Sequence, residues 1–363
     1  MDARRVRIAF WPHTADPDVA STRIRCLQVL QGLAREGADA ALSDGSGSAP
    51  DALVLAKRYD ADTLQRARAW REQAGTRIVL DLCDNHFYYK DASPFWVDRA
   101  KQLRAAARAV DHVVVASDAL GDVVRAQCGD NVAVTTIPDA LDVGPPARRP
   151  RWRERWEVWA WQRFLRRQRV DAGRRLLWFG NHGSPYADGG LQDLHRIADA
   201  LSRHHRDEPL ALTVVSNSRE AFDRLMMGWP VPTHYLPWST LAFSAALRAS
   251  AVALIPAQRN PFTLCKTNNR LATAFTNGLA VAADSLPAYE EFADLAVLDD
   301  WDAGLGRLMR DAAERQRRVA AARERLQQRY SLQMTCRRWI QLFDRLVGVA
   351  PTVRSAAPGK EIA

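Results

Sequence analysis

Two basic residues stand at the start of a predicted helix within residues 260–284. A polar loop, a short helix and a strand are expected there in that order, with Lys266 and Arg270 flanking Asn268 and Asn269 at the helix start. The first N–H groups of a helix have no partner within it, and its dipole is positive at that end. Two cations beside such an end suit a phosphate or diphosphate, and the simpler alternative is a solvated helix cap.

The choice of lysine at position 266 supports a ligand. The chain has five lysines against 46 arginines, so it uses arginine for general surface charge. A lysine ammonium is a compact point charge on a flexible stem, which suits a phosphate.

A second turn has the composition of an anion-binding site. Gly180, Asn181, His182 and Gly183 directly follow a predicted strand at 176–179. The two glycines let backbone N–H groups approach a phosphate closely. An ordinary turn at the end of a strand is the alternative.

These residues must be positioned by alternating strands and helices. Apolar strands are predicted at 6–10, 52–56, 77–82, 112–117 and 132–137, with helices between them, and a similar alternation resumes at 176. Such alternation is typical of doubly wound α/β domains with parallel sheets. Ligands of these folds bind at the carboxyl ends of the strands, so a cleft between two such domains is the expected site.

Bulk composition narrows the class of protein. A length of 363 residues and 47% hydrophobic content fit two ordinary domains. The five cysteines are scattered and show no metal-binding spacing, which favours a reducing compartment and no structural zinc. We expect no signal peptide and no membrane-spanning helix, because no long apolar run is present.

The order of these segments resembles the GT-B glycosyltransferases, especially the retaining nucleotide-sugar enzymes of family 4. The likeness rests on VAVTTIPDALDV at 132–143, LLWFG at 176–180, AVALIP at 251–256, and NPF followed by TNGLAVAAD at 260–284. The family usually has two glutamates in this last motif. The second falls here on Thr273 and the first is replaced near Asn260, and the family's glycine-rich loop after the first strand is also missing.

The resemblance implies a division of the chain into five parts. They are 1–144, a Rossmann-like acceptor domain; 145–175, a basic Trp/Arg-rich linker or amphipathic helix; 176–330, a Rossmann-like nucleotide-sugar domain; 331–349, a helix that can cross back to the first domain; and 350–363, a tail.

It also implies roles for particular residues. Lys266, Asn268, Asn269 and Arg270, with the turn at 180–183, would hold the donor diphosphate. Asp84 and His86, in the loop after the strand at 77–82, would act in catalysis with Lys266. Asp84 could stabilise positive charge or take a proton, and His86 could bind a sugar hydroxyl, whereas helix capping by Asp84 or Asn85 is the alternative.

Four further residues receive binding roles. Trp238 and Glu290 would contact the nucleoside, with packing as the alternative for Trp238 and Glu291 as the competitor of Glu290. Arg23 or Arg25 would bind a phosphate or an acidic acceptor, with a solvated helix end as the alternative.

One segment holds nearly all of the excess charge. Residues 145–175 contain eleven arginines and three acidic residues, a net charge of +8 out of +9 for the whole chain, so the basic pI does not imply nucleic-acid binding. Within it, Trp152, Trp156 and Trp159 recur at helical spacing among arginines. An anionic membrane surface, a protein or oligomer contact, and packing against the chain's own domains all fit this pattern.

The sequence therefore predicts a cytoplasmic glycosyltransferase with hexosyltransferase-like activity. It would move a sugar from a nucleotide-diphosphate donor to a glycan, lipid-linked or small-molecule acceptor, with retention and without a metal or other cofactor. Contact with the inner face of a membrane through residues 151–169 is a further expectation. The alternative from a different class is a non-catalytic GT-B module that binds a sugar nucleotide or acts as a scaffold, which the missing glutamates favour; an epimerase is a third reading.

Overall fold

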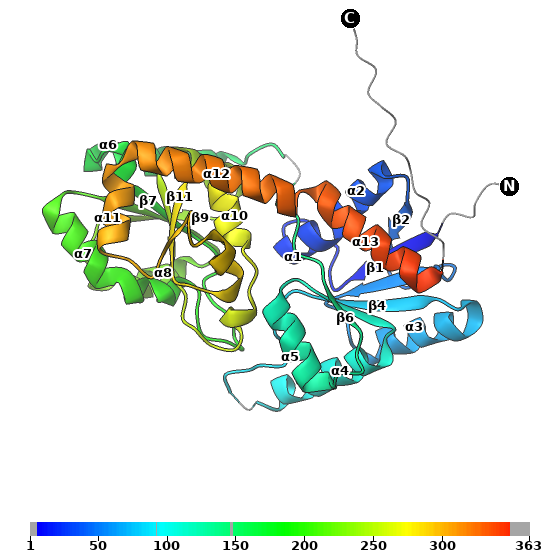
Figure 1. Ribbon diagram of the computed structural model, residues 1–363. Coiled ribbons are helices and arrows are strands. Elements are labelled where there is room, and N and C mark those ends of the chain that lie inside the picture. Colours follow the sequence, from blue (N-terminus) through cyan, green and yellow to red (C-terminus); the bar gives the residue numbers. More distant parts are fainter. Residues whose placement is uncertain (1–5, 92, 146–147, 349–363) are drawn as a thin grey trace, which may run out of the picture.

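The computed structural model describes residues 6–91, 93–145 and 148–348, which form two α/β domains placed side by side (Figure 1). The predicted tail, residues 350–363, lies outside the described residues. Each domain contains one six-stranded sheet, and every strand pairing is parallel. This architecture confirms the predicted fold of two Rossmann-like domains.

The N-terminal sheet has the spatial order β2-β1-β3-β4-β5-β6. Its strands are β1 (Arg7–Pro12), β2 (Asp39–Leu42), β3 (Ala52–Ala56), β4 (Arg77–Leu82), β5 (His112–Val115) and β6 (Val134–Thr136). Its helices are α1 (Ala20–Thr22), the π-helical turn η1 (Arg23–Leu27), α2 (Gln28–Arg35), α3 (Ala61–Ala74), α4 (Pro94–Ala109) and α5 (Asp118–Cys128).

The C-terminal sheet has the order β12-β11-β10-β7-β8-β9. Its strands are β7 (Arg175–Phe179), β8 (Ala211–Ser216), β9 (Thr233–Pro237), β10 (Val252–Ile255), β11 (Ala280–Ala283) and β12 (Val297–Leu298). The longer helices are α6 (Trp152–Gln168), α7 (Ala198–Asp207), α8 (Arg219–Leu225), α9 (Thr240–Ala249), α10 (Asn269–Thr276), α11 (Ala303–Arg310), α12 (Ala312–Tyr330) and α13 (Leu332–Val347). Short 3-10 turns are η2 (Ala172–Arg174), η3 (Leu191–Ile197), η4 (Thr263–Cys265) and η5 (Pro287–Phe292).

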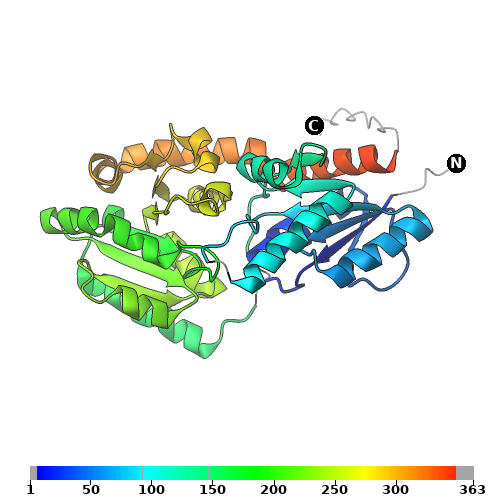
Figure 2. The ribbon, with the colours of Figure 1, turned by 90° about the horizontal axis from the view of Figure 1, so that it is seen from below.

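Both sheets are buried on their two faces, as parallel sheets require. In β3 the side chains of Leu53 and Leu55 join the core on one face, and that of Val54 joins the core on the other. Helices cover both sides of each sheet, as the view from below shows (Figure 2). Because these strands are buried and apolar, the alternation of strands and helices could be predicted from the sequence.

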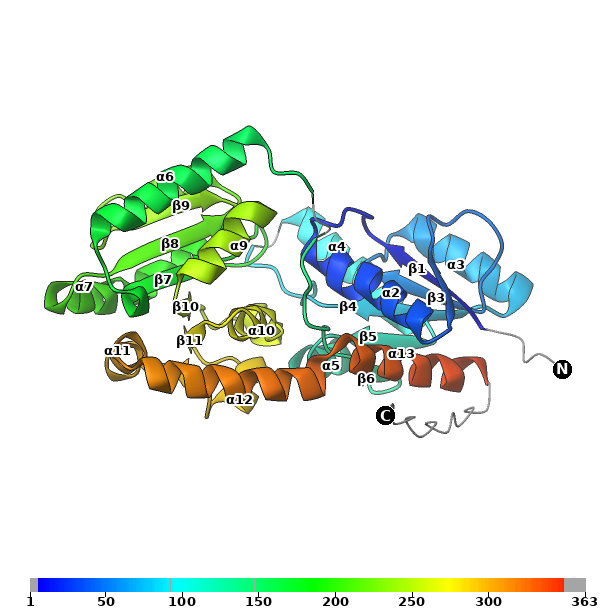
Figure 3. The same ribbon diagram turned by 90° about the horizontal axis from the view of Figure 1, so that it is seen from above.

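The last two helices run along both domains (Figure 3). Helix α12 packs in the C-terminal domain, and after Ser331 helix α13 lies against the N-terminal domain. Its Trp339 ring lies 5.4 Å from Phe10 of β1, centroid to centroid. Helix α2 approaches α13 so closely that a Cβ on Gly32 would lie 2.4 Å from Cys336 Sγ, which is why a glycine occupies that position. The C-terminal helix is therefore part of the N-terminal domain's core.

Candidate active site between the domains

Asp84 lies between two ammonium groups that come from different domains. It follows β4, and its carboxylate accepts from Lys57 Nζ at 2.5 Å and forms an ion pair with Lys266 of the C-terminal domain. Burial alone would raise the pKa of the Asp84 carboxyl, but Lys266 and Lys57 hold it well below its usual range. Asp84 is therefore a permanent negative charge at the strand ends, and the structure brings it to Lys266 as the sequence predicted.

The loop that carries Lys266 is held by the opposite domain. Asn85 Nδ2 donates to the carbonyl of Pro261 at 2.9 Å, and Ser117 Oγ donates to the carbonyl of Cys265 at 2.7 Å. These bonds hold the backbone just before η4 and at its last residue, and the Lys266 ammonium lies 4.1 Å from the centroid of Phe262. Because the bonds cross between domains, the position of Lys266 depends on how the domains are docked.

His86 is neutral and joins a cluster of rings. Burial, together with the charge of Lys57, lowers its pKa to about 3. Its Nδ1 is 2.9 Å from the Tyr59 hydroxyl, and its ring lies 5.5 Å from that of Tyr186 in the other domain. Since the imidazole is uncharged at neutral pH, it can donate or accept a hydrogen bond but does not supply a cation.

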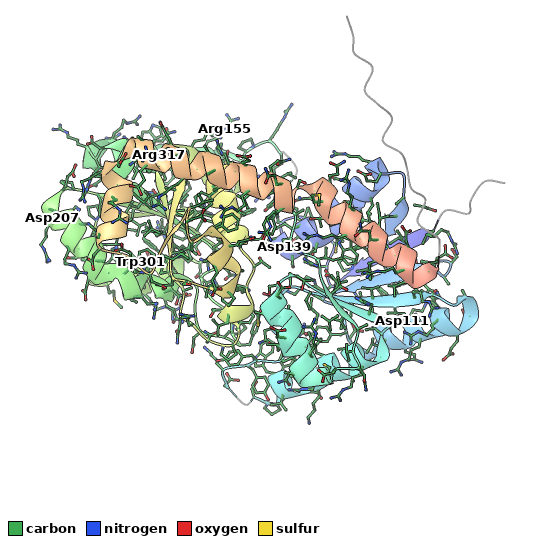
Figure 4. The ribbon with its side chains drawn as sticks, viewed as in Figure 1. Asp111, Asp139, Arg155, Asp207, Trp301 and Arg317 are labelled. Atoms are coloured by element: carbon green, nitrogen blue, oxygen red, sulfur yellow. The ribbon has the colours of Figure 1, made fainter. Side chains whose placement is uncertain are left out.

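The N-terminus of α10 is not capped by a side chain. Asn268 stands at the cap position, but its amide donates to Glu291 Oε1 at 3.2 Å instead of accepting from the first turn. Asn269 Nδ2 donates to Asp139 Oδ2 at 2.5 Å. The two amides are thus turned to carboxylates at the domain boundary, where Figure 4 labels Asp139, and no side chain caps the first N–H groups of α10. Gly278, with φ of +90°, follows the end of this helix as expected.

Arg270 points from this uncapped helix start toward the turn after β7. Its Nη1 lies 3.4 Å from the place a Cβ of Gly180 would occupy, and its guanidinium carbon is 6.0 Å from the Trp178 ring. The same Nη1 is buried and has no hydrogen-bond partner among the described residues. A buried donor without a partner costs free energy, and a ligand anion would satisfy it.

The N–H groups of the turn at 180–183 are less available to an anion than its two glycines suggested. Asn181 and His182 are exposed. Asn217 Oδ1 accepts the backbone N–H of His182 at 3.0 Å, and Asn181 Oδ1 accepts that of Gly183 at 3.1 Å. These two N–H groups already have partners, whereas Arg270 Nη1, which lies beside Gly180, has none among the described residues.

The two arginines of the first helix are engaged by carboxylates. Arg25 donates to Asp81 through Nε at 2.8 Å and Nη2 at 2.5 Å, and to Asp139 through Nη1 at 2.8 Å, with all three side chains buried. Arg23 makes a two-point contact with Asp142, at 2.9 and 2.7 Å. Neither guanidinium lies at a solvated helix end, and these contacts favour a structural role over the predicted phosphate or acceptor binding.

Trp238 and Glu290 were predicted to contact the nucleoside. Among the described residues, neither side chain is hydrogen-bonded to Lys266, Asp84 or the start of α10. Trp238 is half-buried after β9 and packs against the C-terminal core. Glu290 is exposed, whereas its neighbour Glu291 bonds Asn268 and the Tyr330 hydroxyl and lies 2.8 Å from Arg329 Nη1. Of the two glutamates, Glu291 is the one connected to the start of α10.

An interdomain cavity of about 510 Å³ opens beside these residues. It lies between the ends of β5 and β6 in one domain and the start of α10 in the other. Its polar lining comprises Ser117, Asp118, Thr136, Asp139, Thr267, Asn268, Glu291, Arg329, Tyr330 and Arg338. Donors and acceptors of both kinds make this cavity suitable for a hydroxyl-rich or charged ligand.

Sequence reasoning missed Lys57 and Tyr186. Lys57 directly follows β3 and has a left-handed backbone, φ of +54°, a conformation that is uncommon for residues other than glycine and clusters at functional sites. The rarity of lysine was the available signal, because Lys57, Lys90 and Lys266, three of the five, lie at the domain boundary. Among the residues that the structure describes, no group of three His, Cys, Asp or Glu could hold a metal ion.

The fold defined by these two facing domains is GT-B, the class that the sequence resembles. Sucrose-phosphate synthase from Thermosynechococcus elongatus superposes with a TM-score of 0.64 at 13% identity, covering 95% of this chain and 100% of that one. Anabaena HepE, solved with UDP and glucose, gives 0.62 at 13% identity, covering 94% and 100%.

A third similar structure is the Escherichia coli trehalose-6-phosphate protein bound to UDP-2-fluoro glucose. Its TM-score is 0.56 at 14% identity, with coverage of 90% of this chain and 77% of that one. No protein-family model matches the sequence, and no curated protein matches it at a significant level. At such low identities the structural likeness shows the fold, and function must be argued from the site.

Proposed function

We propose that the protein is a glycosyltransferase that moves a sugar from a nucleotide-diphosphate donor to an acceptor, with retention and without a metal ion. The observation that carries this proposal is the buried Arg270 Nη1, which has no partner among the described residues and lies beside Gly180 at the uncapped start of α10. Together with Lys266, it supplies two cations and a helix dipole for the two phosphates of a leaving nucleotide. The similar proteins solved with UDP or a UDP-sugar support a nucleotide ligand.

Departure of the diphosphate leaves positive charge on the sugar's anomeric carbon. A fixed carboxylate stabilises such a charge in a site that excludes water, and Asp84 keeps its charge at neutral pH. Lys266 contacts Asp84 directly, so one ammonium can lie between the carboxylate and the leaving phosphate. Neutral His86 is available to bind a sugar hydroxyl.

The low pKa of Asp84 also bears on which group takes the proton of the acceptor hydroxyl. A carboxylate held below its usual pKa is a weak base at neutral pH. The departing phosphate, with a pKa of about 6, is a better proton acceptor. Transfer of the proton to the leaving group requires the acceptor to attack from the side on which that group departs, which gives retention of configuration.

The proposal also covers the kind of acceptor and the place in the cell where the reaction occurs. The mixed polar lining of the interdomain cavity suits a glycan, a lipid-linked sugar or a small polar molecule. No helix in the described ranges is long and apolar enough to cross a membrane. We place the reaction in the cytoplasm, where nucleotide sugars would be supplied.

A non-catalytic sugar-nucleotide-binding protein is the second candidate. It is favoured by Asn260, which stands near the position where the resemblance puts a glutamate. Its Oδ1 accepts from the N–H groups of Phe262 and Thr263, and its Nδ2 donates to the carbonyl of Asp188. The side chain is therefore used to shape the loop, and it offers no carboxylate to a sugar.

The test uses the purified full-length protein. Thermal shift with UDP, GDP and ADP identifies the base, because a ligand that binds only the folded state raises its stability. The matching nucleotide sugars are then assayed for nucleotide release and transfer. We expect Lys266→Ala to lower turnover by about 10²–10³-fold, the usual cost of losing one charge-stabilising group.

The control is Lys101→Ala, which removes an exposed lysine of α4 that has no ion-pair partner in the described ranges. It should turn over like the wild type. If a nucleotide stabilises the protein but no sugar is released or transferred, the binding-protein alternative is correct. If no nucleotide stabilises it, the donor site itself is wrong.

A further inference from the structure

Helix α6 has two apolar faces, and only one of them is covered. Val158, Trp161 and Leu165 are buried against the C-terminal domain, and Trp161 Nε1 donates to Thr213 Oγ1 of β8 at 3.0 Å. This contact holds the helix in place along the edge strand β9 and helix α9, on the side of the domain away from α12 (Figure 3).

The other face carries three exposed tryptophans. Trp152, Trp156 and Trp159 are 79%, 55% and 48% exposed, and they account for three of the seven exposed large hydrophobic residues in the described ranges. At about 3.6 residues per turn, their spacing of four and three places them on one side of the helix. That side is opposite to Val158, Trp161 and Leu165, so folding of this chain leaves it uncovered.

The charged residues on the exposed face are all cationic. By the same helical spacing it includes Arg163, Arg166 and Arg167, and all three are exposed without an ion-pair partner among the described residues. The guanidinium of Arg163 lies 5.4 Å from the centroid of the Trp159 ring. The acidic residues of α6 lie elsewhere on the helix: Glu154 pairs with Arg148, and Glu157 is half-buried.

We propose that this Trp/Arg face of α6, formed by Trp152, Trp156, Trp159, Arg163, Arg166 and Arg167, binds the surface of an anionic phospholipid bilayer. Indole rings are stable at the boundary between headgroups and acyl chains, and guanidinium groups bind lipid phosphates. A helix of 17 residues is about 26 Å long, and it can lie flat on a bilayer with all three rings inserted.

Two features favour a bilayer over a macromolecular partner. The face lies on one helix, and the hollow beside it is lined by Trp159, Arg163, Arg166, Arg167 and Arg169, so it offers cations to lipid phosphates and presents no acidic group to a basic partner. The helix is also already folded and fixed by Trp161, so binding requires no ordering of the backbone. Arg155, labelled at the outer edge of the molecule in Figure 4, adds a charge beside this face.

The first experiment measures co-sedimentation of the full-length protein with vesicles. Wild type should sediment with vesicles of phosphatidylcholine and phosphatidylglycerol, remain in solution with phosphatidylcholine alone, and be released by salt, because exposed charges are screened. The variant Trp152→Ala/Trp156→Ala/Trp159→Ala should bind at least about tenfold more weakly. Its control, Phe95→Ala/Met227→Ala, removes exposed apolar side chains elsewhere and should bind like the wild type.

The second experiment isolates the charges. Arg163→Gln/Arg166→Gln/Arg167→Gln should lose most of the binding to anionic vesicles. The matched control is Arg68→Gln/Arg317→Gln/Arg337→Gln, three exposed arginines on α3, α12 and α13 that give the same change in net charge. All six residues of the face are exposed, so the thermal midpoints should not change.

Four results would overturn the proposal. Wild type that sediments with neither vesicle, or variants of the face that bind like their controls, would remove its basis. Equal sedimentation with both kinds of vesicle would contradict an anionic surface. A dimer in light scattering that the tryptophan variant dissociates, without vesicle binding, would assign the face to a second copy of this chain.

Discussion

Each domain has a helix start, placed after a strand, at which two basic residues stand close together. In the N-terminal domain these are Arg23 and Arg25 of η1, and in the C-terminal domain they are Lys266 and Arg270 around the start of α10. By sequence the two pairs look alike: Lys266 and Arg270 are predicted to hold a diphosphate, and Arg23 or Arg25 to bind a phosphate or an acidic acceptor. The structure surrounds them very differently.

The arginines of η1 are matched by acids on every side. Arg25 is bonded to Asp81 and Asp139, and Arg23 to Asp142, and these acids come from β4 and from the segment after β6. At α10 the cations are matched less completely, because Lys266 shares Asp84 with Lys57 and Arg270 Nη1 has no hydrogen-bond partner in the described part of the chain. Whether a basic helix start is free to bind a ligand therefore depends on counter-charges that come from segments far away in the sequence.

The largest expected effect follows from removing a matched cation. Arg25→Met leaves Asp81 and Asp139 buried together without their partner, and we expect a loss of about 3–5 kcal/mol in the free energy of unfolding. Urea denaturation measures this loss. Arg23→Met is the control and should cost less, because its partner Asp142 is more exposed to water.

Removing Arg270 should have the opposite effects: little change in stability and a large loss of activity. Arg270→Met deletes a buried donor that has no bond to lose, so the melting temperature should stay the same or rise slightly. Sugar transfer should fall by about 10²–10³-fold, equivalent to about 2.7–4 kcal/mol in the transition state. If Arg270→Met instead destabilises the fold as Arg25→Met does and leaves nucleotide binding intact, the contrast between the two helix starts is wrong.

A further prediction concerns how the stability of the fold depends on pH through His86, which lies beside the same cations. Burial and Lys57 lower the pKa of His86 to about 3 from 6.5. Between these values the unfolded state binds the extra proton, so this histidine's contribution to stability falls as the pH drops below 6.5, by up to about 1.4 kcal/mol per pH unit.

His86→Gln should therefore flatten the fall in melting temperature between pH 6.5 and pH 4. The exposed His195, changed to Gln, is the control and should leave the slope as in the wild type. An unchanged slope in His86→Gln would mean that His86 is not held neutral by the cleft.

The fold was largely predictable because its strands are continuous apolar runs. The strands that were missed are those without such runs: β2 is an exposed Asp-Ala-Ala-Leu edge strand, and β12 has two residues. The helix at 151–169 was also predictable from its periodicity. Its buried Trp161 and exposed Trp152 show that packing and solvent exposure both apply, to different faces.

The candidate site was less predictable, for a physical reason. Lys266, Asp84 and His86 were predicted because they stand beside strand or helix ends, and that position is local information. The roles of Arg25 and Glu291 depend on partners more than thirty residues away in the chain, such as Asp81 and Tyr330. No local pattern reveals those pairings.

The chain passes between the domains twice, once after β6 and once at Ser331, and the two passages touch. The backbone N–H of Leu141 in the first donates to the carbonyl of Tyr330 in the second at 2.9 Å. If the domains opened about this joint, Lys266 and Asp84 would separate, because they belong to different domains. Entry of a substrate between the domains would then require this ion pair to break.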